Sequence, residues 1–442
     1  MSQADEIENI LRARSLPVLD DLCPAGEFVM PDYDGLGIAN LPSTIAALLG
    51  VNLPGACPPL QQDLWADWAE DIKRVVLVVF DALGYLQLRA TMQADADLVF
   101  QRLAQAGRMV PITSTFPSTT CTVLTTLWTG YPPAAHGSLA FELFLRELGV
   151  AASVLFFWPV RHRQRDQLFE WGLDPETFIP VPGIAEHFVA QGVRTHALIA
   201  KAYAASMMTK ILQRGIQETR GFVGQGDMWL ELQRAIARHC DDRHRDGKHR
   251  DRKLFLTLYC STIDGMTHEY SPDDASWHLE LRAMSRMMEE GFLSRLTPEQ
   301  RDGTLLLITA DHGGVSTLLH DAIQLNHHPD LSDALLFPPV GETRVPFMYA
   351  RGDRLEFAKS YMAKLDHSFV TLTREQVLES GLLGPGPMYV ETPHRLGDLI
   401  GIARGNHFLA QNEYHLKMKG RHGGLSPQEM LVPLIGVRLD AL

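Results

Sequence analysis

The sequence predicts an α/β sandwich built around a central, mostly parallel β-sheet. Two observations carry this prediction: short apolar runs have the length and the β-branched composition of buried strands, and helical stretches separate some of them. The strand-like runs cover residues 75–80, 254–258, 305–309 and 431–437. The clearest helical stretch covers residues 275–292. Buried strands that alternate with helices are typical of such a sandwich.

Length and composition set the class of protein. The chain has 442 residues, enough for a large enzyme fold with insertions or for two or three domains. Hydrophobic residues make up 45% and charged residues 21%, which excludes fibrous, low-complexity and wholly disordered classes. The formal charge is −13. We therefore expect no DNA partner, because binding to phosphate backbones needs a clustered positive field.

Three features predict a cytoplasmic protein. The N-terminus is acidic and lacks the basic and apolar regions of a signal peptide. The longest apolar runs fall far below the ~20 residues that span a bilayer, so no membrane insertion is expected. The five cysteines are Cys23, Cys57, Cys121, Cys240 and Cys260. Their odd number and the lack of C-x-x-C spacing favour a reducing compartment. Oligomeric state is left open.

The sequence divides into a core and two additional segments. Residues 1–70 contain proline-rich turns and are predicted to wrap on the core. The core itself is assigned to residues 71–314 and 416–442. Between the two parts of the core, residues 315–415 are irregular and rich in glycine and proline, which indicates a smaller insertion or cap. Within the core, residues 238–253 are strongly charged and predict a solvated loop.

Acidic residues follow three of the predicted strands. Asp81 comes directly after the first run, Asp264 shortly after the second, and Asp311-His312 after the third. One such aspartate is usually a turn or helix-capping residue. Three together indicate a site, because ligands of parallel sheets gather beyond the carboxyl ends of the strands.

A threonine-rich segment, residues 111–130, predicts a strand, a corner at Pro117-Ser118 and then a helix. We expect Ser118 to cap this helix and to leave Thr119 or Thr120 in its first turn. A hydroxyl at a helix N-terminus lies in a positive field that favours an alkoxide and a bound phosphate. The alternative is a capped helix without chemistry.

Three further patterns place histidines near these carboxylates. Asp264 and His268 have the i, i+4 spacing that puts both on one face of a helix, within reach of one metal ion. Asp311 and His312 reach one ion together if the chain leaves strand geometry, which the next two glycines permit. His422 stands in a glycine-rich loop before the last predicted strand.

With these blocks the sequence resembles the alkaline phosphatase superfamily, and within it the type I phosphodiesterase/nucleotide pyrophosphatase family. The blocks are Phe80-Asp81, Thr115-Phe116-Pro117, Thr129-Gly130-x-x-Pro133-x-x-His136-Gly137, Asp264-x-x-x-His268, Asp311-His312-Gly313 and His422-Gly423. They follow the family order from about residue 74 to 437. The resemblance implies an alkaline-phosphatase-like sandwich.

The resemblance also implies two metal ions. Its ligand sets are Asp264, His268 and His422 for one zinc, and Asp81, Asp311 and His312 for the other, which also binds the nucleophilic hydroxyl. Two divalent cations, three aspartates and a deprotonated threonine leave the site near neutral. Three carboxylates and three imidazoles suit zinc better than calcium or magnesium, with manganese as the alternative.

The family pattern points to two different nucleophiles. Counting ten residues back from Gly130 selects Thr120, whereas the Thr-Phe-Pro triplet selects Thr115. The helix-start argument and the spacing both favour Thr120, followed by Thr119 and then Thr115.

The implied activity is hydrolysis of phosphodiester or pyrophosphate bonds through a phospho-threonine intermediate, with nucleotide-type substrates favoured. Phosphomonoesterase, phosphonate hydrolase and phosphomutase activities of the same superfamily are alternatives, as is a non-catalytic metal-binding regulator. A sulfatase is disfavoured, because Cys121 is followed by neither the proline nor the arginine of the C/S-x-P-x-R motif. No substrate-binding residue is predicted, although residues 155–158, expected to be buried, offer a stacking face as the alternative.

Overall fold

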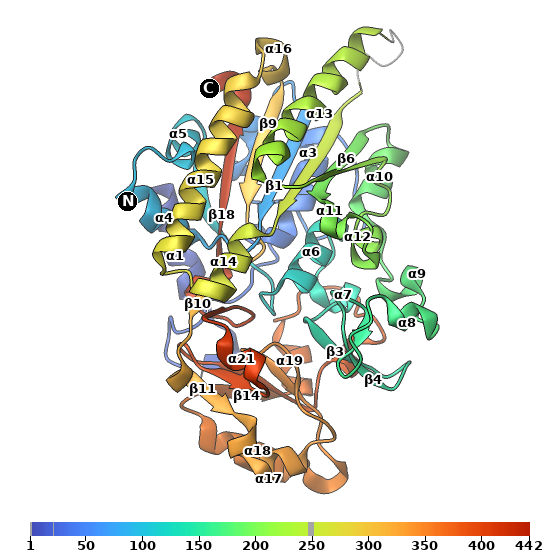
Figure 1. Ribbon diagram of the computed structural model, residues 1–442, viewed down its shortest axis with the longest axis vertical. Helices are drawn as coiled ribbons and strands as arrows, with labels where there is room; N and C mark the ends of the chain where they lie inside the picture. Colours follow the sequence, from blue (N-terminus) through green and yellow to red (C-terminus); the bar gives the residue numbers. More distant parts are fainter. Residues whose placement is uncertain (1, 21, 246–251) are drawn as a thin grey trace.

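A seven-stranded sheet forms the centre of the upper body in Figure 1, with strand order β2-β18-β9-β1-β8-β6-β7. The computed structural model describes residues 2–20, 22–245 and 252–442. The strands are β1 (Arg74–Phe80), β2 (Arg108–Thr113), β6 (Arg194–Ala200), β7 (Glu218–Phe222), β8 (Leu254–Cys260), β9 (Thr304–Thr309) and β18 (Leu431–Arg438). Neighbouring strands run parallel except at β18, which is antiparallel to β2 and β9. The predicted fold class is confirmed.

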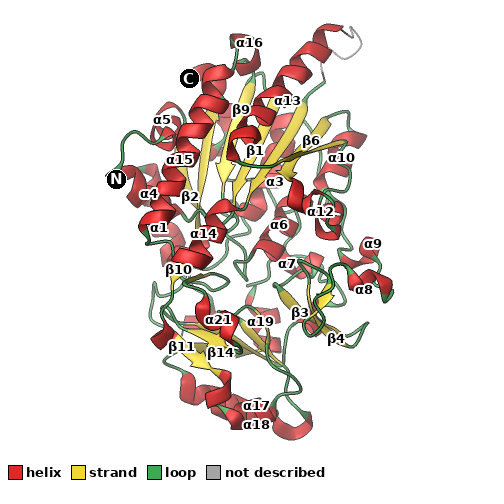
Figure 2. Ribbon diagram, in the orientation of Figure 1, coloured by secondary structure: helices red, strands yellow, loops and turns green. Residues whose placement is uncertain are grey.

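Helices cover both faces of this sheet (Figures 1 and 2). The longer ones are α1 (Gln3–Ala13), α3 (Leu41–Leu49), α4 (Tyr85–Ala94), α5 (Val99–Ala106), α6 (Thr120–Thr129), α10 (Ile184–Ala190), α13 (Gln225–Arg245), α14 (Thr262–Tyr270) and α15 (Ala275–Gly291). Because both faces are covered, all residues of β1 and β9 are buried. This burial explains why these strands are continuous apolar runs rather than alternating ones.

A second seven-stranded sheet, with order β14-β15-β13-β12-β3-β4-β5, lies in the lower body and is antiparallel throughout. Its strands are β3 (Glu142–Leu145), β4 (Val150–Ser153), β5 (Trp158–Pro159), β12 (Val340–Gly341), β13 (Pro346–Met348), β14 (Phe369–Thr373) and β15 (Leu399–Ala403). Helices α17 (Pro329–Ala334) and α18 (Leu355–Met362) pack on it through Leu331, Met362 and Phe369. Two ribbons, β10 (Val315–Ser316) with β17 (Gly420–Arg421) and β11 (Ala322–Gln324) with β16 (Phe408–Ala410), complete this part.

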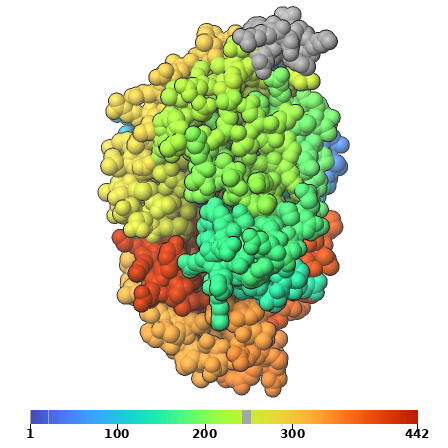
Figure 3. Space-filling model, turned by 45° about the vertical axis from the view of Figure 1, so that its right-hand side comes forward, coloured from blue at the N-terminus to red at the C-terminus, as the bar shows by residue number. Residues whose placement is uncertain are grey.

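The second sheet combines two distant parts of the chain. Residues 340–403 belong to the predicted insertion, whereas residues 142–159 were assigned to the core. The two parts join where Gly341 of β12 pairs with Glu142 of β3. Figure 3 shows one face of the molecule, on which the teal segment around residues 145–170 lies beside the red segment around residues 413–422. The domain boundaries at residues 315 and 415 stay a prediction, because this sheet also contains strands from residues 142–159.

The N-terminal segment crosses the core, as a wrapping segment would. The Val29 N–H donates to the carbonyl of Leu425 (2.8 Å), and the Cys57 N–H donates to the carbonyl of Gly130 (2.8 Å). Helix α1 packs near β2.

None of the helices in the described part of the chain is both long and apolar enough to cross a membrane. The predicted charged loop at residues 238–253 begins instead as the end of α13, which continues to Arg245. Residues 246–251 of that prediction lie outside the described residues.

Candidate active site

The site lies at the carboxyl ends of three adjacent parallel strands. Strands β8, β1 and β9 are neighbours in the sheet, so their ends meet at one edge. Asp81 follows β1, helix α14 follows β8 and carries Asp264 and His268, and Asp311-His312 follow β9. Helix α6 and the loop after β17, which carries His422, complete the site. The structure thus brings the six predicted ligands and Thr120 together.

Asp264, His268 and His422 form the first group of potential metal ligands, with ligand atoms within 4.8 Å of one another. As the i, i+4 spacing predicts, α14 places Asp264 Oδ1 3.3 Å from His268 Nε2. His422 Nε2 approaches the same oxygen at 3.8 Å. This grouping matches the first predicted ligand set.

The second group comprises Asp81, Asp264 and His312. His312 Nε2 lies 3.4 Å from Asp81 Oδ1 and 3.6 Å from Asp311 Oδ2. Asp311 therefore lies beside this group rather than within it, and Asp264, which was predicted for the first ion only, is within reach of both groups. One oxygen of Asp311 is already used, because its Oδ1 accepts the backbone N–H groups of Ala82 (3.1 Å) and His312 (2.9 Å).

The donor atoms at the centre fit divalent cations. Asp81 Oδ1, Asp264 Oδ1 and Asp311 Oδ2 are buried and have no hydrogen-bond partner among the described residues. Buried carboxylate oxygens without a partner are costly unless a cation satisfies them.

The three imidazoles are oriented for the same purpose. Each places Nδ1 against a backbone carbonyl: His268 at Gly420 (2.9 Å), His312 at Gly313 (2.9 Å) and His422 at Ser118 (3.3 Å). An Nδ1–H that donates to a carbonyl leaves the Nε2 lone pair free for a metal ion. All three Nε2 atoms face the carboxylates.

Burial perturbs the titration of this cluster in the metal-free chain. Burial, with the neighbouring charges of Asp311 and Asp264, raises the pKa of Asp81 well above its usual range. Burial also raises the pKa of Asp311. For His422, burial and the nearby His312 and His268 lower the pKa well below its usual range. These shifts disfavour charge at each group, which a bound cation would reverse for the carboxylates.

Thr120 is the threonine whose hydroxyl faces this cluster. It is the first residue of α6, and its Oγ1 lies 3.2 Å from His312 Nε2. Thr119 is the residue before the helix, and its hydroxyl donates to Glu342 Oε1 (2.6 Å). Thr115 is buried, with its hydroxyl against the carbonyl of Pro117 (3.4 Å).

One local expectation needs correction. Ser118 does not cap α6, because its hydroxyl donates to the carbonyl of Gly424 (2.7 Å) and Thr119 occupies the capping position. The two glycines after His312 serve close packing. A Cβ on Gly313 would lie 2.0 Å from the carbonyl oxygen of Gln428, and one on Gly314 would lie 2.9 Å from Thr267.

Sequence reasoning missed two side chains that support the site. The Tyr259 hydroxyl donates to Asp81 Oδ2 and so holds that carboxylate in place. Glu342, from the turn after β12, accepts from the Thr119 hydroxyl and from the Phe141 N–H (2.8 Å). Burial raises the pKa of Glu342 to about 7. Tyr259 had a weak signal in the sequence, because it is a polar aromatic residue within the mostly apolar strand β8. Nothing in the local sequence marks Glu342.

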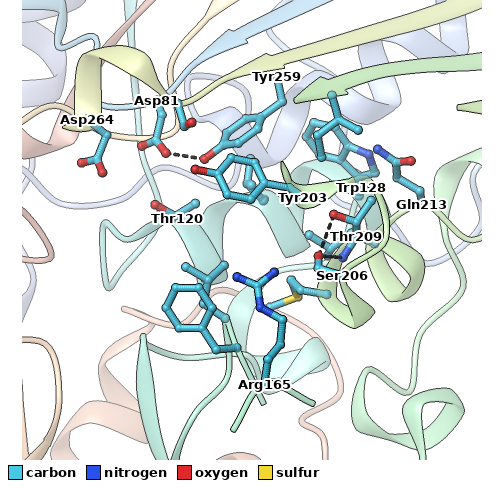
Figure 4. A pocket seen from close by; sticks show the side chains of 17 residues that line it. Asp81, Thr120, Trp128, Arg165, Tyr203, Ser206, Thr209, Gln213, Tyr259 and Asp264 are labelled. Carbon is cyan, nitrogen blue, oxygen red and sulfur yellow. Dashed lines mark hydrogen bonds between the residues drawn. The ribbon is translucent and has the colours of Figure 1, made fainter. Parts of the chain in front are cut away.

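A pocket extends from Asp81, Thr120 and Asp264 (Figure 4). Residues of α6, of α12 (Met207–Leu212) and of the segment 155–165 line it. Its remaining lining residues are Leu124, Trp128, Leu155, Phe156, Arg165, Ile199, Tyr203, Ser206, Met208, Thr209, Leu212, Gln213, Tyr259 and Ser261. Of the predicted apolar run 155–158, Leu155 and Phe156 therefore face the pocket, and Phe157 is buried. Cys121 is buried beside Thr120, and burial raises the pKa of its thiol, so it stays protonated.

The chain was compared with known proteins. A family model described as type I phosphodiesterase / nucleotide pyrophosphatase matches residues 75–425. No curated protein matches. Murine ectonucleotide pyrophosphatase / phosphodiesterase 5 is 16% identical with a TM-score of 0.62, covering 82% of this chain and 87% of its own.

Two further solved structures are similar. An inactive threonine-to-alanine variant of the murine protein, in complex with AMP, is 16% identical with a TM-score of 0.63 and covers 83% of this chain and 88% of its own. Phosphonoacetate hydrolase from Sinorhizobium meliloti 1021, in complex with phosphonoacetate, is 19% identical with a TM-score of 0.58 and covers 88% and 97%. At these identities the likeness concerns the fold, which is alkaline-phosphatase-like.

Proposed function

Because the chain belongs to the type I phosphodiesterase / nucleotide pyrophosphatase family, we propose that it is a two-metal hydrolase of phosphodiester or pyrophosphate bonds. Nucleotide-type substrates are favoured. The observation that carries this proposal is the set of three buried, unpaired carboxylate oxygens that face three imidazole Nε2 atoms beside the Thr120 hydroxyl. The similar murine structure adds support, because its inactive variant lacks a threonine hydroxyl and holds AMP.

We divide the residues between two cations as the family resemblance implies. Asp264, His268 and His422 would hold one ion, and Asp81, Asp311 and His312 the other, next to Thr120. The mixture of carboxylate and imidazole donors favours zinc, with manganese as the alternative. When bound, the two cations supply charge neutralisation for the anionic substrate and lower the pKa of the hydroxyl groups beside them.

Thr120 acts as the nucleophile. Its Oγ1 forms a bond to phosphorus and the hydroxyl proton passes to solvent. The bond from phosphorus to the leaving group breaks, and the leaving group departs with the electron pair as a phosphate anion or as an alkoxide that takes a proton from solvent. Water then attacks the phospho-threonine and restores the free hydroxyl with release of phosphate or a phosphomonoester. The N-terminus of α6 contributes a positive field at the point where negative charge develops.

The same proposal covers partners and location. The substrate is a small phosphate ester rather than DNA, in keeping with the acidic chain. A cytoplasmic location is supported by the absence of any disulfide between the five cysteines, all of which lie in the described part of the chain.

The test combines metal analysis with a matched hydrolysis assay. Wild type and Thr120→Ala are loaded with zinc and assayed on a nitrophenyl phosphodiester, the corresponding monoester and a nitrophenyl phosphonate. We expect about two metals per chain, preference for the diester and a loss of at least about 1,000-fold in kcat for the variant.

Other outcomes would redirect the proposal. Monoester preference indicates a phosphatase or mutase, and phosphonate preference indicates the phosphonate hydrolase alternative. Two metals without turnover of any ester indicate a regulator. No bound metal after reconstitution contradicts the proposed function.

A further inference from the structure

Arg165 is the one positively charged side chain among the described residues that line the pocket beside Thr120. The two carboxylates of this lining, Asp81 and Asp264, belong to the candidate metal centre. The rest of the lining is uncharged, and much of it is apolar or aromatic. In Figure 4 the Arg165 side chain rises from the side opposite Tyr259, and its guanidinium lies below the Tyr203 ring. The pocket thus has an acidic, metal-binding end and a cationic end.

An aromatic stack holds Arg165 at this position. The guanidinium carbon lies 5.2 Å from the centre of the Phe156 ring. Phe156 in turn stacks on Trp158, with ring centres 4.3 Å apart and planes inclined by 25°. A guanidinium on an aromatic face is oriented by that face, while its N–H groups stay available to an acceptor.

Arg165 has no carboxylate partner within the described residues. Arg146 differs in this respect, because it is paired bidentately with Glu391, at 2.7 and 2.8 Å. The fork of N–H groups on Arg165 is therefore available to an anion that enters with a ligand.

We propose that Arg165 binds a second anionic group, carried by the part of the substrate that does not react, so that the protein selects phosphoesters with two separated negative charges. This inference rests on the proposed function, since it takes the phosphorus to lie beside Thr120. The apolar and aromatic walls between the two ends fit a flat or apolar spacer. The second anion is a carboxylate or a second phosphoryl group, since both accept two N–H bonds from one guanidinium.

Binding to zinc-loaded Thr120→Ala protein tests this without turnover. Four phosphate monoesters serve as probes in calorimetry: phenyl phosphate, 4-carbamoylphenyl phosphate, 4-carboxyphenyl phosphate and 1,4-phenylene bisphosphate. The carbamoyl and carboxy probes have nearly the same shape and differ in charge. A parallel set of probes with a longer, biphenylene spacer tests a second distance between the phosphoryl group and the second anion. The same probes are applied to the double variants with Arg165→Gln and, as a control, with Arg161→Gln, an exposed arginine outside the pocket lining.

We expect the carboxy probe to bind about 10-fold more tightly than the carbamoyl probe. This preference should weaken as salt increases, disappear with Arg165→Gln and persist with Arg161→Gln. A stronger gain for the bisphosphate than for the carboxylate identifies a phosphoryl group as the second anion, and the reverse identifies a carboxylate.

Equal affinity for the carboxy and carbamoyl probes at both spacer lengths would overturn the inference, as would a preference that survives Arg165→Gln. Failure of phenyl phosphate to bind metal-loaded protein would instead contradict the proposed function, and this inference with it.

Discussion

Two clusters of buried charge in this protein differ in how completely their oxygens are bonded. In one, Arg344 and Glu429 form a bidentate pair, at 2.6 and 2.8 Å, with both side chains fully buried. Glu429 also accepts the Gly424 N–H (2.8 Å) and the Ser426 hydroxyl (2.6 Å). In the other, at the candidate metal centre, Asp81, Asp264 and Asp311 each retain a buried oxygen that has no hydrogen bond to any described residue.

The difference distinguishes a buried ion pair that stabilises the fold from buried carboxylates that are candidates for binding a ligand. The Arg344–Glu429 pair joins the second sheet to the loop after His422 and is fully satisfied by the protein itself. The carboxylate oxygens of the candidate metal centre that lack hydrogen bonds are costly to bury, and a bound cation would offset that cost. The number of hydrogen bonds at each buried oxygen therefore distinguishes the structural ion pair from the candidate metal ligands.

Breaking the satisfied pair should have the largest effect on stability. Glu429→Gln leaves the Arg344 guanidinium buried without its counter-ion. We expect the free energy of unfolding to fall by about 3–5 kcal/mol. Urea unfolding of the zinc-loaded protein measures this change, and a loss below about 1 kcal/mol would show that the pair does not stabilise the fold.

Removing metal should have the next largest effect, and it should grow with pH. Because burial raises the pKa of Asp81 and Asp311, the stability that their protonated forms contribute is complete below about pH 4 and is lost as pH rises. A bound zinc ion would replace those protons. At a thousandfold excess over its dissociation constant it should stabilise by about 4 kcal/mol.

Melting temperatures with and without chelator between pH 5 and pH 8 check this expectation. The gap between zinc-loaded and metal-free protein should widen as pH rises. A gap that narrows with increasing pH would contradict the assignment of these carboxylates as ligands.

Loosening one ligand should have a moderate effect. Tyr259→Phe removes the hydroxyl that donates to Asp81 Oδ2 and keeps the ring. We expect zinc affinity to fall by about 10-fold, because groups that orient ligands typically contribute that much. Competition with a zinc-binding dye gives the affinity. The matched control is Tyr203→Phe, which also lines the pocket and should bind zinc as wild type does.

The smallest effect on stability, and one of opposite sign to Glu429→Gln, is expected for Asp311→Asn. The amide oxygen can still accept the two backbone N–H groups, while the unpaired charge disappears. Metal-free protein should be unchanged or about 1 kcal/mol more stable. Zinc content should fall from about two to about one per chain. Destabilisation as large as that of Glu429→Gln would show that Asp311 is a structural residue.

Local sequence pattern was sufficient wherever a residue's role depended on its own strand or helix. The apolar runs predicted β1, β8, β9 and β18 because strands buried on both faces cannot alternate with polar residues. Aspartates at the ends of neighbouring parallel strands had to converge. The spacing of Asp264 and His268 placed both on one face of α14.

Pairing between distant segments was not predictable in the same way. Strands β3, β4, β12 and β13 are two to four residues long, and β3 meets β12 almost 200 positions later in the chain. Strand propensity over so few residues is weak, and the pairing depends on contacts with other strands. Glu342 and Arg165 reach the site through this sheet and its loops, so no local pattern marks them.

By itself, then, the sequence determined the fold class and the strand ends that carry carboxylates, and it predicted a set of candidate metal ligands. The sequence favoured Thr120 over Thr119 and Thr115, and the tertiary structure decided that the Thr120 hydroxyl is the one that faces His312. The tertiary structure also decided that Tyr259 supports Asp81 and that Arg165 lines the pocket beside Thr120. The physical reason is range: propensity and periodicity act over a few residues, whereas hydrogen bonds and buried charges are satisfied by whichever segments the fold brings together.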